Sequence, residues 1–505
     1  MPPFNEHHQT LMQNLHPPDW VNPKPSGKYN LVVLGGGTAG LVTAAIASAL
    51  GAKVALVERN LMGGDCLNTG CVPSKGILRV SRGLGEMARS RGLGIRILGE
   101  VHVDFARVME RMQRLRAKIS FNDSVKRFKN MGVDVFLGEG KFIEPKSIEV
   151  SGKILKFSKA AVCTGARPGI STIPGLDADG VLTSENIFSL TELPETLAVI
   201  GAGPIGSEMT QAFARFGSQV FLFESSSHIL PREDEDAAMI LQERLKNEGV
   251  RLLLGSKILS VESRENGKVI HYQLNGEKKE LTVQKILVSI GRTPNVEGLG
   301  LENAGIEFDT KEGIKVNQKL QTTNSRVYAA GDVCFPFKFT HAADATAQIL
   351  IQNALFPHPL GLGYASTGDL IIPRCTYTDP EIAHVGRVDE EMIRRKGDVE
   401  TLTVLLNEID RAILDGEEEG FVRVHLEKGT DRIIGATLVG SHAGEMISEM
   451  TVAINSGAGL GLIGRTIHPY PTQSDAFRKV ATAWRKKGLT QTKKKVLTKW
   501  FSLFR

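Results

Sequence analysis

The sequence is poor in cysteine and tryptophan, and it has no long apolar run. Of its 505 residues, five are cysteine and three are tryptophan. Because only one cysteine pair is closely spaced, a zinc site built from two ligand pairs is disfavoured. No stretch approaches the roughly 20 apolar residues that cross a membrane. The N-terminus lacks the basic start and apolar block of a signal peptide and the arginines of a transit peptide, so we expect a cytoplasmic protein.

The composition is that of a globular protein with several domains. Hydrophobic residues make up 41% of the chain, charged residues 23%, and the formal net charge is +5. This mild charge comes without basic residues interleaved with aromatics over a sheet-like segment, so we expect no nucleic-acid partner. A chain of this length predicts about two to four domains.

Two cysteines, Cys66 and Cys71, lie close together in the segment GGDCLNTGCVPSK. Structural disulfides are rare in reducing compartments, so the pair is a metal clip, a redox couple or a coincidence. A regular helix rises about 7.5 Å over this spacing, which exceeds the roughly 4.4–6.8 Å between the Cα atoms of a disulfide. If the sulfurs bond, the chain between them must therefore be irregular, and Asn68, Thr69 and Gly70 suit such a bend.

The residues after Cys71 predict a helix that begins near Pro73, because proline is favoured at the first helical position. A thiol at a helix N-terminus faces the positive end of the dipole, which favours the thiolate. Lys75 adds a positive charge nearby. Cys71 is therefore the candidate reactive thiolate.

Two segments follow the order strand, glycine turn, helix, strand, acid. In both, the acid follows the first glycine by 23 residues. Glycines of this spacing let the backbone approach a pyrophosphate at a helix N-terminus, and the acid takes ribose hydroxyls. The glycine motifs consist of Gly35, Gly37, Gly40 and Glu58, and of Gly201, Gly203, Gly206 and Glu224. Two dinucleotides beside a redox cysteine pair indicate a resident flavin at the first motif and a mobile nicotinamide at the second.

Serines follow Glu224 at positions 225–227. Because a 2′-phosphate would meet the carboxylate of Glu224, this segment favours NADH over NADPH. Nearby Arg232 weakens that preference, so NADPH remains the alternative.

Together these features resemble the pyridine nucleotide–disulfide oxidoreductases, the flavoenzymes that include dihydrolipoamide dehydrogenase, glutathione reductase and mercuric reductase. The resemblance extends from about residue 29 to about residue 484. It also rests on four further motifs: CTGARP at 163–168, ILVSIGRTPN at 286–295, VYAAGDV at 327–333 and TDPEIAHVG at 378–386.

The resemblance implies FAD as cofactor and NADH, or NADPH, as reductant. Cys71 would lie against the flavin as the charge-transfer thiolate, and Cys66 would be the outer, interchange thiol. Lys75 would bind beside the flavin and pair with Glu208. The further cofactor contacts that the resemblance implies are Gly140, Thr164, Gly165, Gly291 and Asp332.

The implied fold is α/β, with two Rossmann-like dinucleotide-binding domains, for FAD and NAD(P), and a C-terminal α+β dimerisation domain. A homodimer would build active sites that mix residues of both chains. The expected parts are an N-terminal extension at 1–28, the FAD domain at 29–190, the NAD(P) domain at 191–315, a return to the FAD domain at 316–366, the interface domain at 367–486 and a basic tail at 487–505.

The chain departs from the family's thiol reductases near its end. Those enzymes carry a proton-shuttling histidine immediately before Pro-Thr, oriented by a glutamate five residues on. Here the slot holds Tyr470, and the carboxylate partner is Asp475. A phenol with a pKa near 10 cannot readily cycle protons at neutral pH as an imidazole with a pKa of about 6.5 does. Mercuric reductases resemble this chain in carrying tyrosine here; His468 is the alternative base.

We therefore predict an oxidoreductase close to the mercuric reductases without an N-terminal metal-binding domain. It would pass electrons from NAD(P)H through FAD and the cysteines to Hg(II) or another soft electrophile, with Cys66 and Cys71 as transient ligands of a metal-ion substrate. The chain lacks the terminal cysteine pair of the best-known mercuric reductases, which opposes mercury as acceptor. The alternative enzyme is a dihydrolipoamide dehydrogenase or related disulfide reductase, and an alternative of another class is a tail-tethered flavoprotein without turnover.

Four smaller expectations concern segments outside these motifs. The N-terminal arm, with its three histidines, predicts a solvated extension. Residues 107–129 predict one amphipathic helix, and the acidic run at 233–236 a solvated helix cap. The tail carries eight Lys/Arg and no acidic residue from position 485 to 505. Its apolar side chains would form a stripe opposite the lysines, for contact with anionic lipid or with the protein's own surface.

Overall fold

The computed structural model describes residues 5–169, 173–176, 180–386 and 399–504. The chain divides into two compact units. The first unit consists of Met1–Gly83, Glu100–Ser225 and Val250–Leu370, and the second unit of Leu84–Gly99, Ser226–Gly249 and Ile371–Arg505.

The first unit contains a seven-stranded sheet with a parallel core. Its order is β3-β2-β1-β6-β5-β4, with β19 paired to β6. Alternate residues of β1 enter two different apolar clusters: Leu31 and Val33 join one, and Val32 and Leu34 the other. Both faces of the strand are therefore buried, as the continuous apolar run predicts. The strands are β1 Lys28–Leu34, β2 Val54–Glu58, β3 Asp134–Leu137, β4 Gly140–Glu144, β5 Ser147–Val150, β6 Lys153–Val162 and β19 Val327–Ala329.

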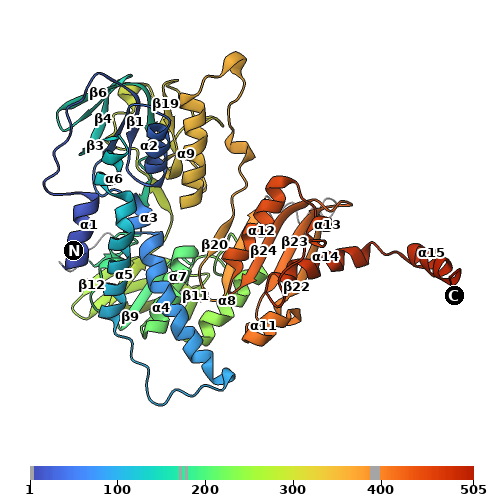
Figure 1. Ribbon diagram of the computed structural model, residues 1–505. Helices are drawn as coiled ribbons and strands as arrows, with labels where there is room; N and C mark the ends of the chain where they lie inside the picture. The colour runs from blue at the N-terminus through green and yellow to red at the C-terminus, as the bar shows by residue number, and fades with distance from the viewer. Residues whose placement is uncertain (1–4, 170–172, 177–179, 387–398, 505) are drawn as a thin grey trace. The chain divides into compact units, whose positions relative to one another are not determined.

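Two helices, α2 (Thr38–Ala49) and α9 (Thr340–Leu355), run side by side against this sheet (Figure 1). The N-terminal arm is not the solvated extension expected from sequence. It forms α1 (Glu6–Leu15), and Leu11 and Leu15 are buried in the same cluster as α2. Burial of these two leucines explains why the arm folds onto the core.

A second sheet in the first unit has five parallel strands in the order β11-β10-β9-β15-β8. Helix α7 (Pro204–Phe216) connects β9 to β10, which is the right-handed crossover expected after a glycine turn. An antiparallel three-stranded sheet, β12-β13-β14, follows. The strands are β8 Val181–Leu182, β9 Thr196–Ile200, β10 Gln219–Glu224, β11 Arg251–Leu254, β12 Lys257–Arg264, β13 Gly267–Leu274, β14 Glu277–Val283 and β15 Lys285–Val288.

The chain passes between these two sheets twice, through β7 (Ala166–Pro168) and β16 (Arg292–Pro294). The two strands pair antiparallel, with Ala166 opposite Pro294. A short pair β17 (Phe308–Asp309) and β18 (Gly313–Ile314) precedes the return to the first sheet.

The helices around the cysteines begin or end at other residues than the sequence predicts. Helix α4 (Cys71–Arg89) begins at Cys71 rather than near Pro73, and α3 (Gly64–Asn68) precedes it. The single helix expected at 107–129 is two, α5 (Phe105–Ser120) and α6 (Val125–Asn130). Ser124 adopts an extended backbone and caps α6, which ends the helical continuity.

The second unit contains a five-stranded antiparallel sheet in the order β20-β21-β24-β23-β22. Helices α12 (Ala443–Ser456) and α14 (Asp475–Lys487) bury their apolar sides against one face, for example through Met450 and Phe477. The strands are β20 Arg374–Thr376, β21 Glu381–Gly386, β22 Val399–Leu405, β23 Phe421–Glu427 and β24 Ile433–Gly440, and the remaining helices are α8 Glu235–Asn247, α11 Asp410–Asp415, α13 Leu460–Ile463 and α15 Gln491–Ser502.

The acidic run before α8 is not a solvated cap. Glu233 pairs with Arg374 of β20 at 2.8 Å, and its side chain is only 7% exposed. Asp234 and Asp236 both pair with Arg423 of β23. These arginines could not be matched to the run from sequence, because they follow it by at least 138 residues.

No helix among the residues described is long and apolar enough to cross a membrane. The expected α/β class, with nucleotide-binding sheets followed by a C-terminal α+β sheet domain, is confirmed.

Candidate active site

The two cysteines lie at a break between two helices of the first unit. Cys66 is in α3, and Cys71 is the first residue of α4. Thr69 and Gly70 fall between the helices, so the connection is irregular, as a bond between the sulfurs requires. Asn68, expected in the irregular stretch, is instead the last residue of α3. Both cysteines are free thiols in this structure. The Cys71 thiol faces the N-terminal end of a helix dipole.

Buried polar contacts hold this break in place. The Asn68 amide donates to the carbonyl oxygens of Met62 and Gly64, at 3.0 and 2.9 Å. The Arg116 guanidinium of α5 donates to the carbonyl oxygen of Asn68 at 2.9 Å. These donors fix the backbone that leads into the break at Thr69 and Gly70.

The two thiols have opposite pKa shifts. The pKa of the Cys71 thiol is lowered to about 6, chiefly by a hydrogen bond from Cys66, with help from Thr340 and the charge of Lys75 and against the opposing effect of burial. The Sγ of Cys71 lies 3.4 Å from Oγ1 of Thr340, the first residue of α9. The same sulfur contact, together with burial, raises the pKa of Cys66. In the reduced protein Cys71 therefore carries the negative charge, and Cys66 keeps its proton.

This assignment predicts the pH dependence of alkylation at Cys71. The rate with iodoacetamide follows the thiolate fraction, so in reduced protein it should be half-maximal near pH 6 and level above about pH 7.5. An unperturbed thiol would still gain rate at about pH 8.5. Peptide mass spectrometry at a series of pH values measures the midpoint. Thr340→Val, which removes one stabilising contact, should move the midpoint upward, and a wild-type midpoint above pH 8 would refute the assignment.

A lysine–glutamate pair lies one turn further along α4. The ammonium of Lys75 is 3.0 Å from Oε2 and 3.1 Å from Oε1 of Glu208 on α7. Glu208 is nearly inaccessible, with 5% of its side chain exposed, against 37% for Lys75. The pair therefore joins the cysteine helix to the helix of the second glycine motif, the pairing that the resemblance implies.

Arg292 connects the cysteine segment to Asp332. Its guanidinium lies 3.0 Å from the carboxylate of Asp65, the residue before Cys66, and 3.4 Å from that of Asp332. Asp65 also accepts a hydrogen bond from the Thr69 hydroxyl at 2.7 Å. Burial raises the pKa of Asp332 in spite of the arginine. A single cation thus holds a carboxylate of the cysteine segment beside a carboxylate predicted to bind cofactor.

The two glycine motifs share one geometry. A Cβ placed on Gly40 would lie 1.8 Å from the carbonyl oxygen of Gly35, and one on Gly206 would lie 1.9 Å from that of Gly201. Only glycine allows the helix to pack this closely on its own turn. No side chain caps the first turn of α2 or α7, so the N-terminal amides are left for a ligand.

The acid of each motif contacts the turn directly. Oε2 of Glu58 accepts the N–H of Gly36 at 2.6 Å, and Oε2 of Glu224 accepts the N–H of Ala202 at 2.9 Å. Burial raises the pKa of Glu58. The other oxygen of each acid accepts as well, from the N–H of Asn60 at 2.7 Å in Glu58. In Glu224 it accepts from the Ser225 hydroxyl at 3.1 Å. A carboxylate oxygen can accept more than one hydrogen bond, which suits these acids to ribose hydroxyls.

The remaining predicted cofactor residues lie in a strand or in the loops that follow strands of the first unit. Gly140 begins β4, where a Cβ would lie 2.5 Å from Leu34 and 2.9 Å from Val57. The Thr164 hydroxyl donates to the carbonyl oxygen of Asn295 at 2.8 Å. Gly165 and Gly291 both adopt positive φ, +68° in each, with open space where a side chain would be.

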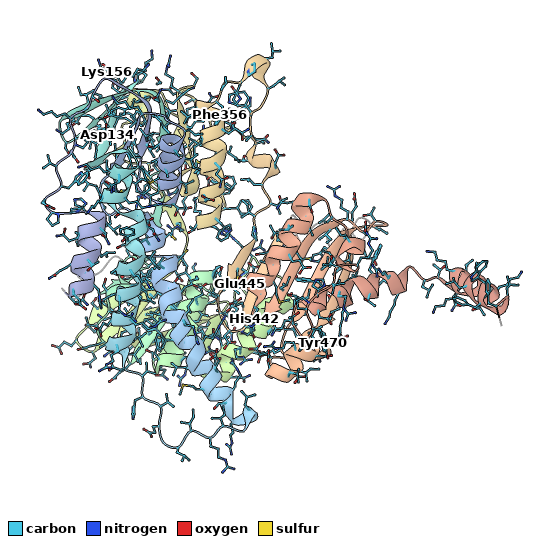
Figure 2. All side chains as sticks on the ribbon, viewed as in Figure 1. Asp134, Lys156, Phe356, His442, Glu445 and Tyr470 are labelled. Atoms are coloured by element: carbon cyan, nitrogen blue, oxygen red, sulfur yellow. The ribbon has the colours of Figure 1, made fainter. Side chains whose placement is uncertain are left out.

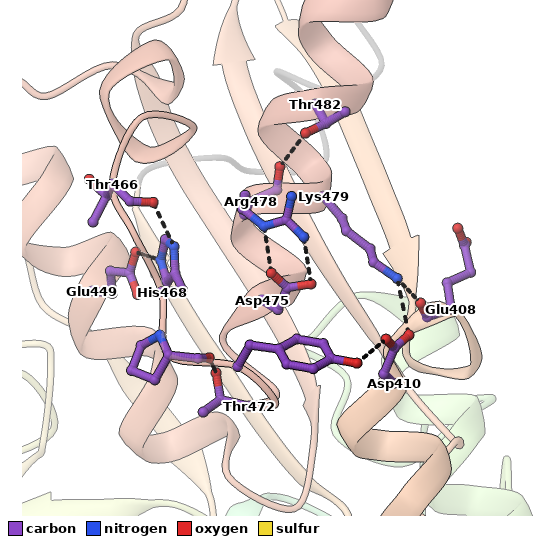
Figure 3. A network of polar contacts seen from close by, with 12 residues as sticks. Glu408, Asp410, Glu449, Thr466, His468, Thr472, Asp475, Arg478, Lys479 and Thr482 are labelled. Carbon is purple, nitrogen blue, oxygen red and sulfur yellow. Dashed lines mark hydrogen bonds and ion pairs between the residues drawn. The ribbon is translucent and has the colours of Figure 1, made fainter.

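Tyr470 and Asp475 lie in the second unit, but they are not hydrogen-bonded to each other. The Tyr470 hydroxyl donates to Asp410 at 2.9 Å, and Asp475 pairs with Arg478 at 2.6 Å (Figure 3). The predicted pairing of tyrosine with Asp475 is therefore wrong in this structure. The hydrogen bond to Asp410 raises the pKa of the exposed Tyr470 phenol, with smaller contributions from the charges of Asp410 and Asp475.

His468 is fixed by contacts at both ring nitrogens. Nε2 lies 2.9 Å from Glu449 of α12, and Nδ1 lies 3.1 Å from the carbonyl oxygen of Thr466. A hollow of about 360 Å³ beside Glu449 is lined also by His442 and Glu445. Figure 2 labels these last two side chains together with Tyr470. Within the described part of the chain, no group of three or more His, Cys, Asp or Glu side chains is arranged to hold a metal ion.

Two family models match the chain. Residues 29–348 match the pyridine nucleotide-disulphide oxidoreductases, and residues 372–481 match the dimerisation domain of that family. The chain belongs to the pyridine nucleotide-disulphide oxidoreductase family. The family uses FAD and NAD(P)H, and the dimerisation domain supports a homodimer.

Relatives of this oxidoreductase include more than one kind of enzyme. The dihydrolipoyl dehydrogenase of Bacillus subtilis (strain 168) is 34% identical over 478 residues, which cover 90% of this chain and 98% of that protein. The mercuric reductase of Staphylococcus aureus is 32% identical over 460 residues, 91% of this chain and 83% of that one. The Cu(II) complex of the HOCl-induced flavoprotein disulfide reductase RclA from Escherichia coli has a TM-score of 0.80 at 28% identity and covers 91% of this chain and 100% of that one.

The first glycine motif of this oxidoreductase fits FAD. Its uncapped helix N-terminus suits a pyrophosphate, and Glu58 has lone pairs for a ribose. We predict that Lys75, Thr164 and Asp332 complete the FAD site.

Several residues of the site could not be identified from sequence. Thr340 is 269 positions from the cysteine it contacts. Arg292 lies within the segment ILVSIGRTPN at 286–295, but its two carboxylate partners, Asp65 and Asp332, are far apart in the chain. Asp410 precedes its tyrosine by 60 residues. Of these additional residues, only Asp65 could have been suspected from sequence, because it directly precedes Cys66.

Proposed function

We propose that this oxidoreductase transfers two electrons from NAD(P)H to Hg(II) or another soft electrophile through a redox-active Cys66–Cys71 disulfide. When bound, FAD supplies two-electron chemistry between the nicotinamide and the sulfurs. Cys71 holds the thiolate at its helix N-terminus, and Cys66 holds the proton and exchanges with the acceptor. Glu224, with Ser225 donating to it at 3.1 Å, favours NADH.

The raised pKa of the Tyr470 phenol is the observation that favours a metal ion over a disulfide as acceptor. Reduction of a disulfide takes the form NAD(P)H + H⁺ + RSSR → NAD(P)⁺ + 2 RSH, so both product thiols need protons. Reduction of mercury takes the form NAD(P)H + Hg²⁺ → NAD(P)⁺ + H⁺ + Hg⁰, and no acceptor atom is protonated. A phenol whose pKa is raised by Asp410 is a poor proton shuttle at neutral pH. His468, bonded to Glu449 and Thr466, is better suited to a structural role.

Two comparisons bear on this proposal in different directions. The RclA structure is described as a Cu(II) complex, which supports a metal ion as acceptor. The dihydrolipoyl dehydrogenase of Bacillus subtilis, at 34% identity, supports a disulfide reductase as the second candidate.

The test compares acceptors in the purified flavoprotein and its Tyr470→His variant. We expect metal-dependent NADH oxidation to exceed turnover of lipoamide or glutathione disulfide in the wild type. Tyr470→His should raise disulfide turnover at least about tenfold, because a positioned general acid typically contributes 10²–10⁴-fold. Tyr470→Phe, the matched control, should change neither activity more than about twofold. Equal wild-type rates with lipoamide and metal, or no gain in the histidine variant, would favour the second candidate.

A further inference from the structure

The last helix of the chain, α15, packs against nothing in the second unit. None of its residues is buried, and every described residue from 485 to 504 is exposed. Thr490 caps the helix by accepting the N–H of Lys493 at 3.3 Å. Isolated helices shorter than about 12–15 residues are marginal in water. A helix of this length therefore needs a surface on which to fold.

The two sides of α15 have opposite character. At about 100° per residue, four apolar side chains of the helix fall within a sector about 160° wide, and the two apolar residues of the turn that follows Ser502 continue it. Trp500 and Phe501 are 56% and 59% exposed, and the rings of Trp500 and Phe504 contact edge to face at 5.1 Å. We call the apolar side chains the apolar sector; they are Val496, Leu497, Trp500, Phe501, Leu503 and Phe504.

Basic residues occupy most of the rest of α15 and the chain before it. Of the four lysines of the helix, Lys494, Lys495 and Lys499 lie outside the apolar sector, whereas Lys493, in the first turn, points along its middle. Residues 485–505 hold eight Lys/Arg and no acid. Such a charge complements an anionic surface. Duplex or single-stranded nucleic acid would leave the apolar sector in water, because its aromatics do not lie among the lysines as in a strand-binding groove. An acyl-chain boundary beside anionic headgroups satisfies both sides at once.

We propose that α15 is an interfacial anchor that docks the protein on a bilayer containing anionic lipid. The apolar sector enters the boundary between headgroups and acyl chains, and the lysines contact the headgroup phosphates and carboxylates. Twelve residues of helix rise about 18 Å, less than the roughly 30 Å of hydrocarbon, so the helix lies in the surface. The anchor is independent of the electron acceptor.

The test is vesicle sedimentation of the full-length, FAD-loaded protein. We expect at least about tenfold stronger partitioning onto vesicles with 30% phosphatidylserine in phosphatidylcholine than onto pure phosphatidylcholine. Raising the salt from 0.1 to 1 M should release most of the protein, because the Debye length falls from about 10 to 3 Å. Truncation after Lys487 should abolish the binding.

Two variants separate the two sides of the helix. Trp500→Ala/Phe501→Ala should weaken partitioning about tenfold or more by removing apolar area. Lys494→Gln/Lys495→Gln/Lys499→Gln should weaken it by at least about tenfold. The charge-matched control, Lys141→Gln/Lys257→Gln/Lys278→Gln at exposed sites of the first unit, should leave partitioning unchanged. Because no variant touches the candidate active site, flavin content and NADH oxidation in solution report folding.

Three outcomes would overturn the proposal. The first is full binding to phosphatidylserine vesicles by the Trp500→Ala/Phe501→Ala variant, which would reduce the effect to bulk charge. The second is tighter binding to a duplex DNA oligonucleotide than to these vesicles at equal salt. The third is loss of self-association on truncation with no vesicle binding in the wild type, which would make α15 an interface between copies of the chain.

Discussion

Replacing Cys71 with serine is expected to lower acceptor-dependent NAD(P)H oxidation by more than about 10³-fold. A serine hydroxyl neither forms a disulfide nor ionises near pH 6, as the Cys71 thiol does at its helix N-terminus. Cys66→Ser should cause a loss of similar size, since each sulfur is half of the same bond. The measurement is anaerobic steady-state oxidation of NADH at saturating acceptor, together with titration of the thiols that appear on reduction.

A matched control is Cys375→Ser. Cys375 lies in β20 of the second unit, partly buried, with its thiol 3.6 Å from a backbone carbonyl oxygen. We expect its replacement to change turnover by less than about twofold and to leave the newly titrated thiols unchanged. If Cys71→Ser kept more than a tenth of wild-type turnover, electrons would have to leave by another route.

The second large effect concerns two glycines of the second motif. Gly206→Ala places a methyl 1.9 Å from the carbonyl oxygen of Gly201, so the turn must open, at a cost of about 1–3 kcal/mol in stability. Gly203→Ala meets no protein atom within 4 Å and should leave stability unchanged. It should still raise the KM for NADH by about tenfold or more, because the added methyl lies where the pyrophosphate approaches.

Thermal unfolding and the KM for NADH distinguish these two effects. Gly92→Ala, at an open position without a positive φ, serves as the control and should alter neither. FAD content should persist in Gly203→Ala, because Gly203 belongs to the motif assigned to the nicotinamide. An unchanged KM in Gly203→Ala would show that no dinucleotide lies against this turn.

Local sequence patterns predicted those parts of the site in which the functional residues are separated by a few positions in the chain. The glycine motifs predicted two strand–turn–helix segments because a turn that tight leaves no space for a Cβ at Gly40 or Gly206. The break at Thr69 and Gly70 followed from the length of a disulfide. These conclusions concern residues near one another in the chain, where covalent geometry limits the possibilities.

Contacts between distant segments were not predictable in the same way. Asp410 and Asp475 are both candidate hydrogen-bond acceptors for the Tyr470 hydroxyl. Only tertiary packing determines that the hydroxyl donates to Asp410. Arg116 reaches the carbonyl oxygen of Asn68 only because α5 packs beside α3. The burial of Leu11 in α1 likewise depends on a surface built by residues elsewhere. A single sequence does not encode such pairings in its periodicity.

The antiparallel pairing of β7 with β16 has a consequence for how this architecture is assembled. The chain departs at Ala166 and comes back at Pro294, directly opposite, so the two ends of the segment between them meet, although its residues Ser226–Gly249 belong to the second unit. Because these ends meet, the length of the inserted segment places no separating strain on the sheet that carries Glu58, which keeps its own connections.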